Sequence, residues 1–394
     1  MERVDLRDSF HREIEVLELN DDFMIYALDQ KNEIRDLCSI ERMDLSSREV
    51  QRLVSLDYTR LWESFRTYAQ MPGFFYAVNV LADYRLRLRK IDKTTWEISS
   101  DILINPEGEI INIYSLNEDY LIVTDEVKAT PEILEKYGLK DEGHRYVNVR
   151  YLYEFKTAKK YPIVDGHFDS KTEEIPVCLM AGEPTVVYEA FYREEARENA
   201  EGMSEIAVAA VDSLIAHIKA DGLVGFRTVA GAGEDGFDYV RRLAVAPDRI
   251  LYRRRQAATG REQLVEKTVG ANGGYDTKVL ADYVVPAKGE VFYDISARKV
   301  YWCPDDEDAP VKNIRCLSEE GPEISYDGKY GTFLGLFNDE LLATAYYEEV
   351  FVKEYEYHEY VALHDLKSGL VDTAAGRMEH TGRKVVLLRS FLAL

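Results

Sequence analysis

The side chains most suited to binding an anion belong to three neighbouring arginines, Arg253, Arg254 and Arg255. The segment 241–261 carries seven arginines and one acid, Asp248, in a chain whose net charge is −23. Guanidinium groups bind carboxylates and phosphates through paired hydrogen bonds, so the segment is a candidate site for an anionic ligand or an acidic partner. Alternation along a β-strand would place Arg254 on the opposite face from the other two. Pairing with acids on adjacent strands is the competing expectation.

A second candidate consists of Asp165, His167 and Asp169, where two carboxylates and a histidine stand in one short segment. Such side chains can hold a divalent cation or a polar ligand. Their spacing does not fix a geometry, and a solvated loop is the alternative. The acidic run 305–308 lacks the spacing of an EF-hand. We therefore expect no metal and no cofactor, and retain the three residues as candidate ligand-binding side chains.

Familiar catalytic and nucleotide-binding motifs are absent from the sequence. It contains no G-x-S-x-G, H-E-x-x-H or G-x-x-x-x-G-K-[ST] pattern. Residues 231–236 match G-x-G-x-x-G, but Glu234 and Asp235 would face the phosphates and the following segment is typical of a strand. We interpret this segment as a turn. With 72 acids in the chain, a catalytic carboxylate pair cannot be chosen from the sequence, so the catalytic residues stay unknown.

Composition and charge restrict the class of protein. The chain is 46% apolar and 31% charged, as soluble globular proteins are, and 394 residues suit two to three domains or one repeat architecture. The negative charge disfavours nucleic acid and anionic membranes as partners. No segment resembles a signal peptide or a membrane span. The four cysteines form no C-x-x-C pair, so we expect free thiols and a cytoplasmic location.

Short polar turns between apolar stretches recur along the chain, and each predicts a β-hairpin. They occur at 19–25, 116–122, 181–187, 246–251 and 337–342, with weaker copies at 70–75 and 286–291. A second pattern, interpreted as a closing turn, centres on apolar residues at 28, 91, 155, 218, 295 and 366. Each repeat would therefore combine a hairpin, a third strand and a closing turn.

A four-stranded antiparallel unit repeated six or seven times resembles the blades of β-propeller repeat proteins. The resemblance covers residues 12–390 and points to no particular family, since the Gly-His and Trp-Asp pairs of WD40 repeats do not recur. We predict an all-β chain with one propeller domain over 12–390 and an N-terminal extension over 1–11. The strand-like segments 14–17 and 385–388 are expected to tie the two chain ends together.

Three insertions are predicted to be helical, near 46–69, 130–138 and 194–203. Ser46 and Glu49 have the spacing of a capping box, and Pro131 suits the first position of a helix. The competing architecture has two domains, an α+β N-terminal part and a β-rich C-terminal part.

Propellers host many unrelated functions, so the resemblance implies function only by analogy. The leading hypothesis is a non-enzymatic module that binds a protein or a small polar ligand, with neither nucleic acid nor membrane as partner. The alternative is a propeller enzyme, a hydrolase or lyase, that acts on a carbohydrate or another small polar substrate in the central channel.

Overall fold

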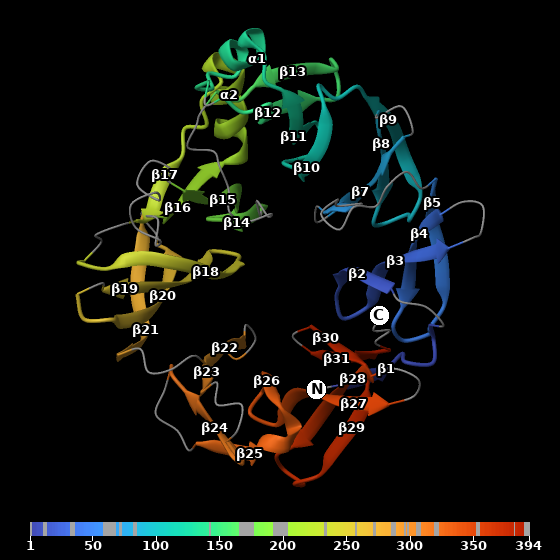
Figure 1. The fold of residues 1–394 in the computed structure, drawn as a ribbon, viewed down its shortest axis with the longest axis vertical. Helices are drawn as coiled ribbons and strands as arrows, with labels where there is room; N and C mark the ends of the chain where they lie inside the picture. The colour runs from blue at the N-terminus through green and yellow to red at the C-terminus, as the bar shows by residue number, and fades with distance from the viewer. Residues whose placement is uncertain are drawn as a thin grey trace. The chain divides into compact units, whose positions relative to one another are not determined.

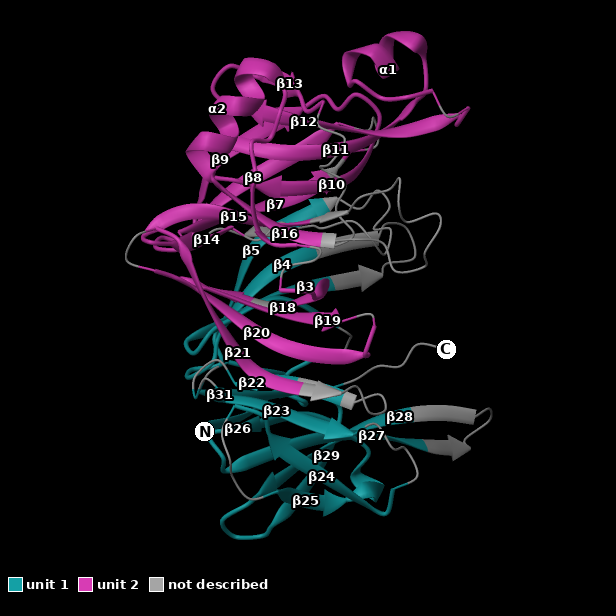
Figure 2. Cartoon of the chain, turned by 90° about the vertical axis from the view of Figure 1, so that its left-hand side faces the viewer, with its two compact units in different colours: residues 1–56, 285–394 teal, residues 57–284 magenta. Residues whose placement is uncertain are grey.

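The computed structural model describes residues 2–10, 14–31, 36–57, 68–70, 73–81, 85–141, 143–164, 177–191, 204–231, 235–256, 258–270, 273–284, 289–294, 297, 299–304, 309–318, 323–351, 355–381 and 383–389. These residues form 31 strands, two α-helices and one short 3-10 helix (Figure 1). They divide into two compact units, one over 57–284 and one made of 1–56 and 285–394 (Figure 2).

The unit of residues 57–284 contains four sheets, each with four antiparallel strands in chain order. The first two are β6 (Tyr68–Gln70), β7 (Phe74–Val80), β8 (Leu86–Asp92) and β9 (Ile98–Ile104), then β10 (Glu109–Ser115), β11 (Tyr120–Lys128), β12 (Tyr146–Glu154) and β13 (Lys159–Pro162). The other two are β14 (Val177–Met180), β15 (Glu183–Phe191), β16 (Ser204–Ala210) and β17 (Arg227–Ala230), then β18 (Asp238–Ala246), β19 (Arg249–Gln256), β20 (Arg261–Val269) and β21 (Tyr275–Val284).

The unit of residues 1–56 and 285–394 contains three further four-stranded sheets and one of three strands. The four-stranded sheets are β2 (Ile14–Leu19), β3 (Phe23–Lys31), β4 (Asp36–Asp44) and β5 (Val50–Asp57); β22 (Gly289–Asp294), β23 (Lys299–Pro304), β24 (Val311–Cys316) and β25 (Ile324–Asp327); and β26 (Thr332–Phe337), β27 (Leu341–Phe351), β28 (Tyr355–Asp365) and β29 (Val371–Ala375). The last sheet has the order β1 (Glu2–Asp5), β31 (Lys384–Leu388), β30 (Arg377–His380), and η1 (Gly328–Tyr330) precedes β26.

The repeated antiparallel order of four strands is that of propeller blades, which confirms the predicted all-β propeller class. Seven four-stranded sheets among the described residues are consistent with the larger of the two predicted blade numbers. The N-terminal part holds strands throughout its described ranges apart from one short helix, so the α+β alternative is wrong. Among all the residues that the structure describes, no helix is long and apolar enough to cross a membrane.

Five of the predicted hairpins, and the weaker copy at 70–75, join the first two strands of their sheets, whereas the weaker copy at 286–291 is wrong because its described residues lie inside the first strand β22. Asn20 and Asn117 occupy equivalent turns, where each side-chain Oδ1 accepts hydrogen bonds from two backbone amides, including that of Phe23 at 2.9 Å and that of Tyr120 at 3.1 Å. At the turn before β27, Asn338 and Asp339 both have positive φ, as the two central residues of a type I′ turn require. Local turn chemistry therefore determines where these sheets begin.

The closing-turn pattern is only partly correct. The copies centred on 91, 155 and 366 do join third and fourth strands. In two of them an aspartate carboxylate accepts a backbone hydrogen bond: Asp92 from the amide of Thr94 at 2.7 Å and Asp365 from that of Lys367 at 2.9 Å. The copy centred on 28 lies inside β3, the copy centred on 218 lies inside a helix, and the copy centred on 295 follows a first strand. The even spacing of the six centres was therefore partly coincidental.

Only one of the three predicted helices is confirmed. It is α1 (Pro131–Lys136), where Thr130 Oγ1 accepts a hydrogen bond from the Ile133 amide. The helix predicted over 46–69 is wrong for its described residues: the Asp44 carboxylate accepts hydrogen bonds from the amides of Ser46 and Ser47, and the strands β5 and β6 follow. Residues 58–67 and 194–203 lie outside the described part. The unpredicted α2 (Val211–Asp221) buries apolar side chains at 211, 214, 215 and 218, a helical spacing.

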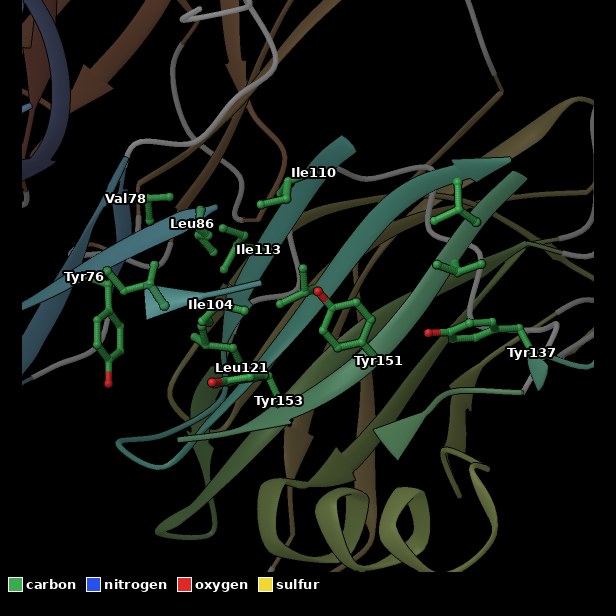
Figure 3. Packing of buried hydrophobic residues seen from close by; sticks show 14 of the residues in the cluster. Tyr76, Val78, Leu86, Ile104, Ile110, Ile113, Leu121, Tyr137, Tyr151 and Tyr153 are labelled. Carbon is green, nitrogen blue, oxygen red and sulfur yellow. The ribbon is translucent and has the colours of Figure 1, made fainter. Parts of the chain in front are cut away.

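Facing sheets within each unit pack through apolar side chains. Between the sheets β6–β9 and β10–β13, Leu88, Leu121, Val123 and Tyr151 are fully buried, and Figure 3 shows the tyrosines Tyr76, Tyr137, Tyr151 and Tyr153 among the aliphatic residues of this cluster. The rings pack among these apolar side chains, while the hydroxyl groups of Tyr76, Tyr137 and Tyr151 donate hydrogen bonds to Glu118, Glu107 and Asp125.

Buried tyrosines of the second strands also fasten one sheet to the next. Tyr76 of β7 donates a hydrogen bond to the backbone oxygen of Glu118, in the first hairpin of the following sheet, at 3.2 Å. Tyr301 of β23 donates to Asp339, in the equivalent hairpin of its own following sheet. Lys90 binds the Glu118 carboxylate at 2.9 Å and Lys299 binds that of Asp339 at 2.6 Å. In each unit, a tyrosine and a lysine of one sheet therefore bind a residue in the first hairpin of the next sheet.

The chain ends meet through the predicted C-terminal segment 385–388, which lies in β31, but its N-terminal partner differs from the predicted one. β1 pairs in parallel with β31, with Val4 opposite Val386, whereas the predicted segment 14–17 belongs to β2 and pairs with β3. Residues 2–5 are thus part of a sheet and not an N-terminal extension. Val4 and Leu6 are buried beside Val386 and Leu388, so burial of apolar side chains stabilises this pairing.

Candidate functional site

The candidate arginines on β19 alternate between faces as predicted. Arg253 and Arg255 both bind Glu262, on β20, whose side chain has no exposed surface, and Arg255 Nε lies 2.8 Å from Glu262 Oε1. Burial acts to raise the pKa of Glu262, but the two guanidinium groups outweigh it and hold this pKa below its usual value. For these two arginines, the expected pairing with an acid on the adjacent strand is confirmed.

Arg254 lies on the other face and is nearly buried. Its Nε donates to Gln263 Oε1 at 3.0 Å, its Nη1 lies 3.2 Å from Asp235 Oδ2, and its guanidinium group lies 4.8 Å from the centre of the Phe237 ring. A ligand anion would have to displace the Asp235 carboxylate to reach this group. Ligand binding by the three arginines therefore stays a prediction.

Asp165, His167 and Asp169 lie outside the described residues, so their site also stays a prediction. Within the described residues, no group of three His, Cys, Asp or Glu side chains could hold a metal ion. The G-x-G-x-x-G segment leads into the strand β18, where a dinucleotide site would need a helix. This agrees with its interpretation as a turn.

A polar cluster that the sequence did not indicate surrounds the buried Asp125 of β11. Tyr151, from β12, donates to Asp125 Oδ2 at 3.0 Å, and the backbone amide of Glu107 donates to the same oxygen at 2.6 Å. The Glu107 carboxylate in turn binds Lys136, at the end of α1, at 2.7 Å and lies 3.7 Å from Lys160 of β13. We call these five residues the Asp125 cluster.

The two carboxyl groups of the Asp125 cluster have pKa values shifted in opposite directions. Burial raises the pKa of Asp125 to about 6, against the weaker opposing effects of the Glu107 amide, Tyr151 and Lys160. Burial also acts to raise the pKa of Glu107, but hydrogen bonds from Lys136 and Tyr137 outweigh it and lower this pKa. The second oxygen of Asp125, Oδ1, is buried without a hydrogen-bond partner among the described residues.

Divergent pKa values of two adjacent carboxyl groups are typical of acid–base catalysis. A catalytic acid must, however, reach its substrate, and Asp125 has no exposed surface. Its visible role is to hold the backbone where β9 passes into β10. There a Cβ atom on Gly108 would lie 2.1 Å from the Glu126 backbone oxygen. The Asp125 cluster is therefore a structural anchor in this conformation.

A partly exposed aromatic surface lies on one face of the long hairpin formed by β27 and β28. Tyr346 and Tyr360 are directly opposite in the register, and their rings stack with centroids 5.2 Å apart and an interplanar angle of 14°. Tyr330, from η1, meets Tyr346 edge-on at 6.2 Å. We call Tyr330, Tyr346 and Tyr360, together with the adjacent Glu348, the tyrosine face.

The inner end of the tyrosine face is fixed by His364 of β28. Tyr330 also packs edge-on against this imidazole, with centroids 4.9 Å apart, and His364 Nε2 lies 3.2 Å from Thr344 Oγ1. Burial lowers the pKa of His364, which favours its neutral form. A buried, hydrogen-bonded imidazole thus positions the Tyr330 ring relative to Tyr346.

The outer end of the tyrosine face is anionic. Glu348 lies two residues beyond Tyr346 on the same face of β27, is exposed, and has no ion pair with any described residue. Burial and the negative charge of Glu348 raise the pKa of Tyr346. Among the described residues, no cation lies over the ring of Tyr346 or Tyr360. The face therefore offers aromatic rings and a carboxylate to an external group.

The sequence contains a signal for this surface that is not a catalytic or binding motif. Tyr346 and Glu348 alternate on one strand and His358 and Tyr360 on the next, so pairing the strands brings all four to one face. Identifying that face requires the register of the hairpin, which composition alone does not supply.

Comparison with known proteins adds structural resemblances and no family. No family model and no curated protein matches the chain. An uncharacterised protein from Listeria monocytogenes has a TM-score of 0.41 at 9% identity, with 100% of this chain and 89% of that chain covered. The β-propeller domain of the trilobed protease from Pyrococcus furiosus has a TM-score of 0.43 at 10% identity, with coverages of 92% and 98%.

Peptidases with larger chains also resemble this protein. Prolyl oligopeptidase B from Galerina marginata has a TM-score of 0.42 at 11% identity, and the match covers 87% of this chain and 45% of that chain. The protein thus spans less than half the length of that peptidase. Its propeller class rests on its own strand order.

Proposed function

We propose that the protein is a non-enzymatic binding module that docks a segment of a protein partner on the tyrosine face. The observation that carries this proposal is the combination of stacked, partly exposed rings at Tyr346 and Tyr360 with the exposed carboxylate of Glu348, which forms an ion pair with no described residue. Tyrosines with an apolar body and a polar tip are enriched where proteins bind partners.

The paired state of the other charged groups supports binding over catalysis. Arg253, Arg254 and Arg255 are paired with Glu262 and Asp235, and the pKa-shifted Asp125 lies in the core. An enzyme would present such groups to its substrate. We also assign the protein to the cytoplasm, because the described cysteines Cys178, Cys303 and Cys316 are free.

Peptide-display selection on the immobilised full chain tests the proposal without an assumption about the partner. We expect selected peptides to lose binding to the variant Tyr346→Leu/Tyr360→Leu and to keep it with Tyr347→Leu. Tyr347 is 63% exposed on the same strand but lies on the opposite face, so it is a matched control. A circular dichroism melt must first show that each variant folds.

The alternative enzymatic function has one specific observation in its favour, the divergent carboxyl groups of Asp125 and Glu107. Hydrolysis of nitrophenyl glycosides by the wild type, lost in both Asp125→Asn and Glu107→Gln, would replace our proposal by the enzymatic one. Peptides that bind independently of Tyr346 and Tyr360 would remove the tyrosine face from the proposal.

A further inference from the structure

Within the protein, a lysine already binds a tyrosine ring beside a carboxylate. Lys329 Nζ lies 4.9 Å from the centre of the Tyr330 ring and 3.0 Å from Asp327 Oδ2. An ammonium group over a tyrosine ring is attracted by the ring quadrupole, and the carboxylate holds it in place. Tyr330 is itself part of the tyrosine face, so this arrangement lies at one end of that surface.

The outer end of the tyrosine face repeats these components without the cation. Tyr346 and Glu348 are two residues apart on one strand, which separates them by about 7 Å along it. A lysine or arginine side chain can span that separation, with its charge against Glu348 and its methylene groups on the ring. Within the described part of the chain, no lysine or arginine pairs with Glu348 or lies over the ring of Tyr346, and His358 of β28 is the residue directly opposite Glu348 in the register.

The surrounding charge also favours a cation. Glu348 places a carboxylate at the outer end of the tyrosine face, and the whole chain carries a net charge of −23. Such a field increases the rate of encounter with a basic partner and repels an acidic one. An anionic anchor is therefore disfavoured both by the carboxylate at the site and by the molecule as a whole.

We infer that the tyrosine face binds a basic peptide segment, with a lysine or arginine side chain seated over the stacked Tyr346 and Tyr360 rings and paired with Glu348. This inference rests on the proposed function and adds to it the chemistry of the partner. The partner is then a protein with an exposed basic stretch, recognised through one cationic anchor and weaker surrounding attraction.

A lysine-rich peptide of about ten residues, with glycine and serine between the lysines, is the direct probe. Its affinity for the full-length protein is measured by isothermal titration calorimetry and compared with that of the same peptide with acetylated lysines. We expect acetylation to weaken binding at least about tenfold, because the cation–π contact and the ion pair disappear together and 1.4 kcal/mol corresponds to tenfold.

Two charge-matched variants separate the site from general attraction. Glu348→Gln and Glu359→Gln remove the same charge on paired strands, but Glu359 lies opposite Tyr347 and so on the other face. We expect Glu348→Gln to weaken binding of the lysine peptide at least about threefold and Glu359→Gln to change it less than twofold. Equal weakening by both variants would overturn the inference, since it would show non-specific attraction.

Failure of the inference and failure of the proposed function give different results. If the acetylated peptide binds as well as the lysine peptide, and both still need Tyr346 and Tyr360, the docking face stands and its cationic specificity is wrong. If the lysine peptide binds equally to Tyr346→Leu/Tyr360→Leu and to the wild type, the inference and the proposed docking on the tyrosine face are both wrong. Because Tyr346→Leu can lower stability, Glu348→Gln, which changes an exposed side chain, provides an independent test.

Discussion

At the scale of single residues, tyrosine carries much of the architecture. Tyr76 and Tyr301 fasten one sheet to the hairpin of the next, Tyr151 holds the carboxylate of Asp125, and Tyr346 and Tyr360 form an exposed stack. The same side chain serves core and surface because its ring is apolar and its hydroxyl group needs a polar partner. Several of the chain's 27 tyrosines therefore join packed rings to polar partners on a neighbouring strand or sheet.

Asp125 gives the first prediction at this scale. Its pKa is about 6 in the folded chain and 3.8 without the fold, so folding favours the protonated form. Its contribution to stability is present below about pH 4 and is lost as the pH rises to 6, by about 3 kcal/mol. Asp125→Asn should therefore gain about that much stability relative to the wild type between pH 4 and pH 8 in urea unfolding.

Tyr151→Phe provides the comparison for Asp125→Asn. The Tyr151 hydroxyl group lowers the pKa of Asp125, so its removal should raise this pKa further and steepen the loss of stability towards neutral pH. The difference in unfolding free energy between Asp125→Asn and the wild type isolates the effect of Asp125. The pKa values of Glu107 and His364 are lowered, and both groups are present in both proteins. A stability difference between Asp125→Asn and wild type that is equal at pH 4 and pH 8 would refute the assignment.

Arg254 gives a second residue-scale prediction. Because Asp235 occupies its guanidinium group and the chain is strongly acidic, phosphate should raise the melting temperature no more in the wild type than in Arg254→Ala. Thermal melts in phosphate and in chloride of equal ionic strength test this. A saturable, phosphate-specific stabilisation that disappears in Arg254→Ala would instead establish an anion site.

Residue types were predictable, but their partners were not. The sequence predicted that Arg254 would lie opposite Arg253 and Arg255, because alternation is a local property of a strand. It did not predict Asp125, since neither the amide of Glu107 nor the hydroxyl group of Tyr151 is close to it in sequence. Burial, which sets the pKa of Asp125, arises only when two sheets pack.

At the scale of elements, tight turns determine where the strands begin and end. Some connections between sheets also pass close to the backbone of a neighbouring strand. Asn20 and Asn117 were recognisable because a side chain that caps its own turn needs no distant partner. β5 was mistaken for a helix because Ser46 and Glu49 have the spacing of a capping box and are followed by Leu53 and Leu56, three residues apart, which are buried here in a strand. α2 was missed because its segment was interpreted as a closing turn.

The connection between β9 and β10 gives the prediction for elements. Gly108→Ala would place a Cβ atom 2.1 Å from the Glu126 backbone oxygen and 2.6 Å from Val127 Cγ1. Neither atom lies on a flexible side-chain end, so we expect a loss of at least about 2 kcal/mol. Gly73→Ala is the control, since no atom lies within 4 Å of its added Cβ atom and its φ is not positive.

Urea unfolding of Gly108→Ala and Gly73→Ala measures whether the connection at Gly108 tolerates a Cβ atom. Equal stability of Gly108→Ala and Gly73→Ala would mean that the connection relaxes and does not hold β10 in place. A larger pH dependence in Gly108→Ala would in addition show that the connection and Asp125 are coupled, because Asp125 accepts the neighbouring Glu107 amide.

At the scale of the whole molecule, the two units differ in how the chain builds them. Residues 57–284 form one unit from a continuous segment, whereas the other unit needs both chain ends. The repeat of four-stranded sheets was predictable from turns, because each sheet is local in sequence. The pairing of β1 with β31 was not, since the sequence offers several short apolar segments near the ends and no local rule that selects among them.

Leu6 tests whether the chain ends stabilise their unit. It is fully buried beside Val386 and Leu388, and its amide donates to the backbone oxygen of Leu387 at 2.9 Å. Leu6→Ala keeps that hydrogen bond and leaves a cavity, so it should lower the free energy of unfolding by about 2–5 kcal/mol. Leu370→Ala, at a side chain that is 71% exposed, should change it by less than about 0.5 kcal/mol.

Hydrogen exchange then locates the loss caused by Leu6→Ala. Because Leu6, Val386 and Leu388 belong to the unit of residues 1–56 and 285–394, we expect amides of β1, β31 and β3 to exchange faster, while those of β11 and β12 keep their protection. Equal acceleration throughout 57–284 would mean that the two units unfold as one. Unchanged exchange in β31 would mean that β1 contributes nothing to the stability of its sheet.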